Sequence, residues 1–496
     1  MPRTARGIWL VRFGAVWVLG LLWTLGSPLF VGPDEPSHTV KAAAVVRGQL
    51  LPDKVPDSRL QFVTVPSRLD AANASAICIA FKPQQDASCV DYSGPTEDAK
   101  VPTYVGRYPP ALYAVIGLPT LVSTSVAAIY AMRLLFVTIT ALCVASALAD
   151  LDELGGRLAR VGILVALTPM TLFLSGTINP SAAEIATALL VWTSALRLVR
   201  RAEAGTVSGR DLARCGSAAL VLVLTRPLSP LWLACIGAVI AIGFAPGAAL
   251  GAIAASWTAR AWAAVLAVAC AAQTAWVLLA HPIYGSSEFA TEWTMSETLR
   301  NSIGRLSAHV REMIGVFGWL DTPAPDITRL VWLMAVGLLL LAAVAAATWR
   351  ERGAIGLLLA VVIIVPVMLE AKEASELGLT WQGRYTLPVA AGLPLLGAVL
   401  LSRRLPVPPT FVRSLTTLIA VALATGHVLA FWQSLRRFSV GSNGPLLFFW
   451  DARWDPPVPS FVLLLAYVGA VSALMWSAVT LGSVAHRPPE GEPSRT

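Results

Sequence analysis

The sequence predicts an all-α polytopic membrane protein, a bundle of about 12 transmembrane helices. Of its 496 residues, 56% are hydrophobic and only 13% are charged, and the mean hydropathy is +0.68. A soluble globular chain carries about 25% charged residues, because its surface must meet water. Apolar windows of about 18 or more residues recur along most of the chain, which is the length needed to cross a bilayer. These observations argue against a large soluble enzyme, a disordered chain and a coiled coil.

The first apolar run, residues 8–30, follows two arginines, Arg3 and Arg6. No small-residue cleavage site follows this run, so we expect a first transmembrane helix with a cytoplasmic N-terminus rather than a cleaved signal peptide. Residues 31–109 then form a long polar segment. A connection of this length is typical of a functional loop, and we expect it to be the first extracytoplasmic loop.

The apolar stretch of residues 110–151 is interrupted by Arg133 and could hold two spans or one. With two spans, the strongest basic loop, residues 197–214, would lie outside the cell. With one span, near residues 129–149, this loop and the later basic loops all lie inside, as the positive-inside rule requires. We therefore expect residues 110–127 to form a juxtamembrane or re-entrant helix.

The later spans follow from hydropathy and from the same charge rule. They are expected near residues 160–178, 181–199, 214–226, 230–246, 260–280, 328–348, 354–370, 385–401, 414–433 and 459–482. The span near 214–226 is short and ends at Arg226-Pro227, which predicts a broken helix that lines a cavity. Residues 281–327 and 433–460 become two further outer loops.

We expect a single transmembrane domain, residues 1–485, followed by a disordered tail, residues 486–496, that is rich in Pro, Glu and Ser. Both termini would be cytoplasmic, in a plasma membrane such as the bacterial inner membrane. Under this assignment the net charge of +8 is an orientation signal, with arginines inside and carboxylates largely outside. It does not indicate a nucleic-acid partner.

The sharpest polar cluster, PDEPSH at residues 33–38, directly follows the first predicted helix, with Lys41 just beyond it. A carboxylate at this position could take a proton from a hydroxyl group. Alternatively, Asp34, Glu35 and His38 could ligate a divalent cation such as Mg, Mn or Ca. The remaining interpretation is a solvated acidic turn that ends a helix.

A second cluster, WQGRYTLP at residues 381–388, opens a later span. Gly383 permits close backbone approach, and the five donors of Arg384 suit a phosphate, such as that of a lipid-linked substrate. The alternative is a snorkelling arginine in an aromatic belt. Glu184 is expected about one turn inside the bilayer, where Arg226 would be its counter-charge or a ligand for an anion.

Other polar residues have local interpretations. Asn179 precedes a proline and is expected to cap a helix. Tyr108, in the run RYPP, is typical of the membrane interface. Asp321 lies in an outer loop before a span. Cys78 and Cys89 share the first polar loop, and they could form a disulfide if this loop faces an oxidising compartment.

Together these motifs resemble the DUF2142 family of bacterial membrane proteins. The motifs are Pro-Asp-Glu-Pro-x-His after the first helix, Tyr-Pro-Pro-x-x-Tyr, an Asn at the end of a mid-chain span, Gly-x-Leu-Asp before a later span, and Gln-Gly-Arg-Tyr-x-x-Pro. The resemblance covers roughly residues 8–435. That family is similar to a branch of the GT-C glycosyltransferases, which depend on polyprenyl-phosphate sugars and carry juxtamembrane helices in a large first outer loop.

The resemblance implies a role for each motif. Asp34 would be the catalytic base or a metal-binding acid, with Glu35 as its partner and His38 in support. The residues expected to hold the donor phosphate are Arg384, Gln382, Tyr385 and Arg226. The residues expected to contact substrate are Tyr108, Lys41, Asn179, Glu184, Asp321 and Trp381. The sequence departs from the family pattern after Asn179, where Pro-Ser stands and an acidic residue often follows.

The leading interpretation is an inverting glycosyltransferase on the outer face of the membrane, with Asp34 as its base. Its partners would be a polyprenyl-phosphate-sugar donor and a cell-envelope glycan or lipid acceptor. A transporter or flippase of a lipid-linked sugar would need the phosphate site but no base. A non-catalytic protein of envelope assembly would need neither.

Overall fold

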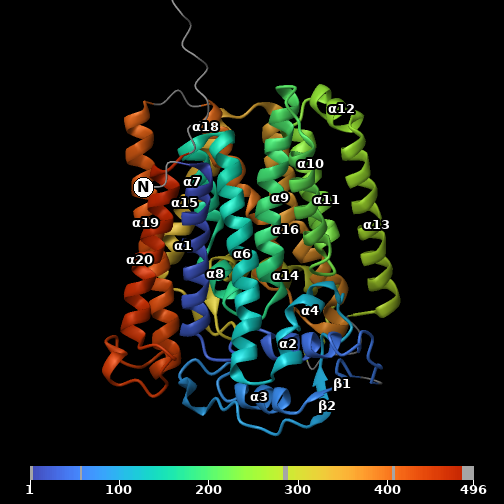
Figure 1. Cartoon of the computed structure of the whole chain (residues 1–496), viewed down its shortest axis with the longest axis vertical. Coiled ribbons are helices and arrows are strands. Elements are labelled where there is room, and N and C mark those ends of the chain that lie inside the picture. The colour runs from blue at the N-terminus through green and yellow to red at the C-terminus, as the bar shows by residue number, and fades with distance from the viewer. Residues whose placement is uncertain (1–3, 56–57, 283–288, 405–407, 483–496) are drawn as a thin grey trace, which may run out of the picture.

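The computed structural model describes residues 4–55, 58–282, 289–404 and 408–482, and it is built mainly of helices (Figure 1). Among the described residues, nine helical segments are long and apolar enough to cross a membrane, or ten if one bent pair counts as a span. The nine are α1 (Ala5–Gly26), α6 (Val126–Leu154), α9 (Pro180–Glu203), α13 (Trp257–Ala280), α15 (Asp326–Ala346), α16 (Trp349–Leu377), α17 (Gly383–Ala390) continued by α18 (Gly392–Arg404), α19 (Pro409–Val440) and α20 (Ser460–Thr480). The predicted class, an all-α polytopic membrane protein, is confirmed.

Three of the predicted spans differ from a straight membrane-crossing helix. The run near residues 160–178 forms α7 (Gly156–Ala166) and α8 (Pro169–Ser175), which are bent by 65°. The runs near 214–226 and 230–246 form α10 (Gly209–Val223) and α11 (Ser229–Gly243). Each of these two has 15 residues, or about 22 Å at 1.5 Å per residue, against about 30 Å of hydrocarbon. The part of the chain that the structure describes thus has fewer full spans than the expected twelve.

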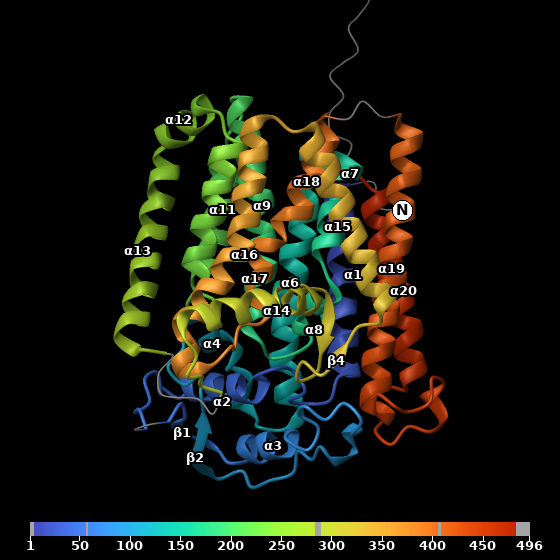
Figure 2. The ribbon, with the colours of Figure 1, turned by 180° about the vertical axis from the view of Figure 1, so that it is seen from behind.

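A layer of short elements covers one end of the bundle, and we call it the loop layer (residues 31–125; Figures 1 and 2). Its elements are α2 (Glu35–Val45), β1 (Gln61–Pro66), α3 (Arg68–Ala76), the 3-10 helix η1 (Ala87–Cys89), β2 (Asp98–Thr103), α4 (Ala111–Ile116) and α5 (Pro119–Val122). Strands β1 and β2 pair antiparallel, with Gln61 opposite Thr103. A disulfide joins Cys78 to Cys89. Helices α4 and α5 have six and four residues, too few to span, so this part of the chain supplies one span, α6.

The remaining elements connect the spans. They are α12 (Gly247–Ala255), α14 (Met295–Gly315), the hairpin of β3 (Val316–Phe317) and β4 (Thr322–Pro323), and the 3-10 helix η2 (Phe448–Trp450). Helix α14 lies across the bundle just above the loop layer (Figure 2) and packs on α16 and α17. It has a capping box, in which Thr294 and Glu297 satisfy each other's backbone N–H groups.

An aromatic cluster joins α1 and α20 to α8, α19 and the β3–β4 hairpin. The indole of Trp23 in α1 donates to the Tyr467 hydroxyl of α20 at 3.1 Å. Its ring also packs against Phe173, Phe317 and Phe431, with centroids 5.0–5.5 Å apart. Such contacts add to the burial of large apolar surfaces and fix the relative positions of the helices.

Basic side chains gather at the end opposite the loop layer, which we call the arginine-rich end. Arg12 of α1 donates to the Leu481 carbonyl just after α20, at 2.7 Å, so the described ends of the chain meet here. Arg12 and Arg160 both form ion pairs with Asp152, at 2.8 and 2.6 Å. The arginine-rich junctions after α6, α9 and α18 also lie at this end. The positive-inside rule predicts that this end is cytoplasmic.

Candidate active site

The turn after α1 presents Asp34 at the edge of the loop layer. Asp34 is the N-cap of α2 and has a left-handed backbone, with φ of 63°. A Cβ on Gly32 would lie 2.8 Å from the side chain of Thr177, so the turn packs tightly against the α8–α9 junction. Asn179 caps α9 and donates from its amide to the Pro33 carbonyl at 2.8 Å. Strained residues held this firmly are concentrated at functional sites.

Arg384, from the first turn of α17, meets the Asp34 carboxylate. The Nη2 atom of Arg384 lies 2.5 Å from Oδ2 of Asp34, and the Tyr104 hydroxyl donates to Oδ1 at 2.5 Å. Burial alone would raise the pKa of Asp34, but the charge of Arg384 and the Tyr104 hydrogen bond lower it below its ordinary value. Asp34 is therefore ionised at neutral pH. Its side chain keeps 23% of its exposure, so it is accessible to a reactant.

Two nitrogens of Arg384 have no partner. Nη2 donates to the Asp34 carboxylate and also lies 3.2 Å from the Tyr385 hydroxyl. The buried Nε and Nη1 form no hydrogen bond with any described residue. A buried donor that lacks an acceptor costs free energy. Their N–H groups point to different edges of the guanidinium plane, because Cδ lies between Nε and Nη1, so each nitrogen is a separate charged donor for a carboxylate or phosphate. These two donors of Arg384 are therefore suited to an anion.

Arg226 also lies beside the Tyr385 ring. The guanidinium carbons of Arg226 and Arg384 lie 4.4 and 5.1 Å from the ring centroid. Arg226 donates to Ser181 at 2.6 Å and lies 3.6 Å from the Glu184 carboxylate. The structure thus brings Glu184 and Arg226 together, as the sequence suggested, and places two arginines beside one tyrosine. The second arginine adds positive charge to the region around Asp34.

Glu35 faces away from Asp34 and is fully occupied. Its carboxylate receives two donors from Arg133, at 2.7 and 2.9 Å, and the backbone N–H groups of Gly32 and Ile178, at 3.1 and 2.9 Å. Both Glu35 and Arg133 are fully buried. The expectation that Glu35 is a catalytic partner of Asp34 therefore needs correction. It anchors the turn to α6 and to the α8–α9 junction.

His38 and Lys41 are also held by protein groups. The Nδ1 atom of His38 lies 2.8 Å from the Tyr113 hydroxyl, and burial lowers the pKa of His38 to about 3, so its ring is neutral. The ammonium of Lys41 donates to the carbonyls of Leu50, at 3.0 Å, and Gly106. Burial lowers the pKa of Lys41 to about 7. Lys41 thus ties together loop segments and is not placed to contact a substrate.

The same geometry tests the expected cation site. The described residues contain no group of three or more His, Cys, Asp or Glu side chains that could hold a metal ion. Asp34 faces Arg384, Glu35 faces Arg133, and His38 faces Tyr113. The three residues therefore do not fit a shared Mg, Mn or Ca site.

Helix α14 fixes the segment that leads to Arg384. Glu312 accepts from the backbone N–H of Gly383 at 2.6 Å, and a Cβ on Gly383 would come within 2.2 Å of the His309 carbonyl oxygen. The close backbone approach expected of this glycine is therefore present. Arg305 of α14 donates to the carbonyl of Trp381 at 3.3 Å. The segment is thus held from one side by a single helix.

The other expected residues lie at different distances from Asp34. Trp381 is buried, and its ring packs edge-on against Tyr385. The side-chain oxygen of Gln382 is buried and without a partner among the described residues. Tyr108 is half-buried beside His38, and burial raises its pKa to about 12. Asp321 forms its ion pair elsewhere, with Arg437 of α19 at 3.2 Å, and so is a structural residue of the β3–β4 hairpin.

Sequence reasoning missed three residues of this region. Arg133 carried a usable signal, since it is an isolated charge inside an apolar span and such charges have a partner or a function. Tyr104 and Glu312 carried none, because a tyrosine in a loop and a glutamate on an amphipathic helix are ordinary residues. Burial raises the pKa of Tyr104 well above its ordinary value, so its hydroxyl stays protonated and donates to Asp34.

Comparisons with known proteins agree with the membrane assignment. No curated protein sequence matches this chain. Among solved structures, the chain is similar to ArnT from Cupriavidus metallidurans in the apo state, with a TM-score of 0.46 and 14% identity over 97% of this chain and 78% of that chain. The same protein bound to undecaprenyl phosphate gives a TM-score of 0.44 and 13% identity over 96% and 78% of the two chains. The family described as "Predicted membrane protein (DUF2142)" matches residues 17–393, most of the chain, and this protein therefore belongs to the DUF2142 family.

Proposed function

We propose that this protein is a membrane glycosyltransferase that moves a sugar from a polyprenyl-phosphate-linked donor to a hydroxyl of a cell-envelope glycan or lipid. One observation carries the proposal. A partly exposed carboxylate, Asp34, lies against a buried arginine, Arg384, and two nitrogens of this arginine have no partner among the described residues. A base and an anion site are thus adjacent at one end of a membrane-spanning bundle.

The position of Arg384 favours a lipid-linked phosphate. Arg384 is the second residue of the span that begins at Gly383, so it lies at the boundary between the loop layer and the apolar helices. A phosphate at this boundary leaves its polyprenyl chain beside the spans. Arg226, which also contacts the Tyr385 ring, would add a second positive charge beside the same anion.

Asp34, Arg384 and Arg226 account for every proton and charge that moves in the sugar transfer. The acceptor oxygen forms a bond to the anomeric carbon while the bond from that carbon to the phosphate oxygen breaks, which inverts the configuration. The acceptor proton goes to Asp34. The leaving polyprenyl phosphate gains one negative charge, which Arg384 and Arg226 stabilise.

Donor binding would also strengthen the base. In the free protein, the charge of Arg384 lowers the pKa of Asp34. A phosphate held by a free N–H donor of Arg384 would bring a negative charge near Asp34 and would share the positive charge that now favours ionisation. Like charges raise the pKa of a carboxylic acid, so Asp34 becomes a better proton acceptor once the donor is present.

Charge distribution gives the proposed orientation. The loop layer would face outward from the plasma membrane, because the arginine-rich end is expected to be cytoplasmic and would hold both termini. A sugar donor without a nucleotide, such as a polyprenyl-phosphate sugar, suits an active site on the outer face of the membrane.

The test is sugar transfer in proteoliposomes that contain the full chain and a set of synthetic polyprenyl-phosphate sugars. We expect product with at least one donor, and a loss of turnover of about 100-fold or more in Asp34→Asn, the range of general-base catalysis. Wild-type turnover in this variant would remove Asp34 as the base. Movement of the donor lipid across the membrane without a new glycosidic bond, and unaffected by the substitution, would instead indicate a flippase.

A further inference from the structure

Two adjoining cavities open at the arginine-rich end, on the far side of the bundle from Asp34. Their volumes are about 380 and about 500 Å³, and they share Glu153, Leu154 and Arg200. They lie among the end of α6, the end of α9, the start of α16 and the end of α18. We call them together the arginine pocket. Its basic lining residues are Arg197, Arg200, Arg201, Arg403 and Arg404.

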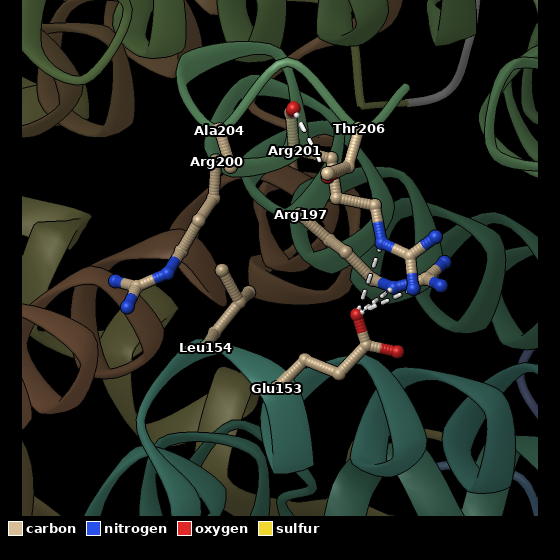
Figure 3. A pocket seen from close by; sticks show the side chains of 7 residues that line it. All are labelled: Glu153, Leu154, Arg197, Arg200, Arg201, Ala204 and Thr206. Atoms are coloured by element: carbon tan, nitrogen blue, oxygen red, sulfur yellow. Dashed lines mark hydrogen bonds and ion pairs between the residues drawn. The ribbon is translucent and has the colours of Figure 1, made fainter. Parts of the chain in front are cut away.

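The carboxylates of this pocket are already paired. Figure 3 shows Arg197 and Arg201 converging on Glu153, each with a nitrogen 2.9 Å from its Oε2 atom. Glu351 forms an ion pair with Arg404 at 3.0 Å. Asp152 pairs outside the pocket, with Arg12 at 2.8 Å. These three acids are thus paired with other arginines, while Glu203, at the end of α9, and Glu351 lie close enough to Arg403 to act on its charge.

Arg200 and Arg403 are different. Both are exposed, and neither forms an ion pair or a side-chain hydrogen bond with the part of the chain that the structure describes. In Figure 3, Arg200 extends from the other side of the pocket, away from Glu153. Two like charges in one pocket repel each other, and an anion between them would remove that cost.

We propose that the arginine pocket binds a phosphate-bearing anion, with Arg200 and Arg403 as its main contacts. Guanidinium groups match phosphate oxygens in geometry and charge. The cavity volumes lie within the usual range of small-molecule sites. Basic pockets between transmembrane helices on the cytoplasmic side bind anionic lipid head groups. The same chemistry would hold a soluble phosphate, and the two sources can be separated by experiment.

The test uses the full chain in nanodiscs of neutral phosphatidylcholine. In one arm, cardiolipin or phosphatidylglycerol is added and retained lipid is counted by native mass spectrometry. In the other arm, inorganic phosphate or pyrophosphate is titrated and binding is measured by calorimetry. The variant is the double substitution Arg200→Gln, Arg403→Gln. Its matched control is Arg210→Gln, Arg413→Gln, which removes two exposed, unpaired arginines from the same end but outside the pocket.

We expect one class of ligand to bind to the wild type and to the control variant, and to bind at least about tenfold more weakly to the pocket variant, since hydrogen bonds to charged groups are worth about 1.5–3 kcal/mol. Binding of cardiolipin or phosphatidylglycerol alone would identify a lipid head group. Binding of phosphate or pyrophosphate alone would identify a soluble ligand. Equal binding to the two double variants, or no binding to the wild type in either arm, would overturn the proposal. An unchanged thermal unfolding midpoint shows that the pocket variant is folded.

Discussion

The adjacent carboxylates Asp34 and Glu35 should differ in how much their loss of charge affects stability and activity. Glu35→Gln leaves Arg133 charged at a position where its side chain has 0% exposure. Breaking a buried pair by removing one partner costs about 3–5 kcal/mol, because the remaining charge is neither solvated nor paired. The amide oxygen of glutamine also replaces only one of the two oxygens that accept from Arg133, Gly32 and Ile178. This loss is a large fraction of a typical free energy of unfolding, which is about 5–15 kcal/mol.

Thermal unfolding of the purified protein in detergent measures this difference. We expect Glu35→Gln to lower the unfolding midpoint more than Asp34→Asn does, because Glu35 and Arg133 are both fully buried whereas the Asp34 side chain keeps 23% of its exposure. Asp34→Asn should remove sugar transfer. Glu97→Gln serves as the matched control, because Glu97 is an exposed carboxylate of the same loop layer. The reasoning is refuted if Glu35→Gln unfolds at the same temperature as the wild type and the Glu97 control.

Three further predictions follow from single contacts. Glu312→Ala removes the acceptor of the Gly383 N–H. We expect steady-state kinetics to give a KM for the donor at least about tenfold higher, and thermal unfolding to give an unchanged midpoint. An unchanged KM would show that Glu312 is not a positioning residue. The pKa of Asp34 is lower in the folded protein than its ordinary value of 3.8. Its ion pair with Arg384 therefore contributes fully to folding stability above pH 3.8, and this contribution is lost as the pH falls through the pKa of the folded state. Donor binding should raise the pKa of Asp34 again. In pH–rate profiles, kcat should therefore fall on the acid side at a higher pH than kcat/KM for the donor does. If the two profiles fall at the same pH, donor binding does not change the pKa of Asp34. Replacing Cys78 and Cys89 by serine opens a loop with a sequence separation of 11 and should cost about 3 kcal/mol, seen as a lower unfolding midpoint that reductant reproduces in the wild type.

Hydropathy and charge predicted the bundle because both reflect the bilayer directly. Apolar runs mark spans, and arginines between the runs mark one face of the membrane. The twelve predicted apolar runs are all helical. The same pattern gave no reliable count of full spans, because α10 and α11 are apolar yet only 15 residues long each. Length within a run depends on where Pro227 and the neighbouring turns end the helices, and hydropathy averages over such breaks.

The candidate site was predicted in part. Asp34 and Arg384 were both identified from their local motifs, although they are 350 residues apart. Their direct contact was beyond sequence reasoning, since it depends on how α17 packs beside the loop layer. The roles of Glu35 and Lys41 were misassigned for the same reason. A charge near a membrane boundary indicates a partner, but the partner can be an arginine or a backbone carbonyl as readily as a substrate.

The left-handed backbone at Asp34 explains how neighbouring residues take such different positions. In a regular helix start, both side chains would leave the chain in related directions. With φ of 63° at Asp34, the chain bends between the two carboxylates, so that Glu35 points into the bundle toward Arg133 while Asp34 points toward Arg384. The buried pair therefore fixes the turn on which the candidate base is held. A base held by rigid spans needs no reorganisation when a substrate arrives, which is the condition under which electrostatic catalysis is most effective.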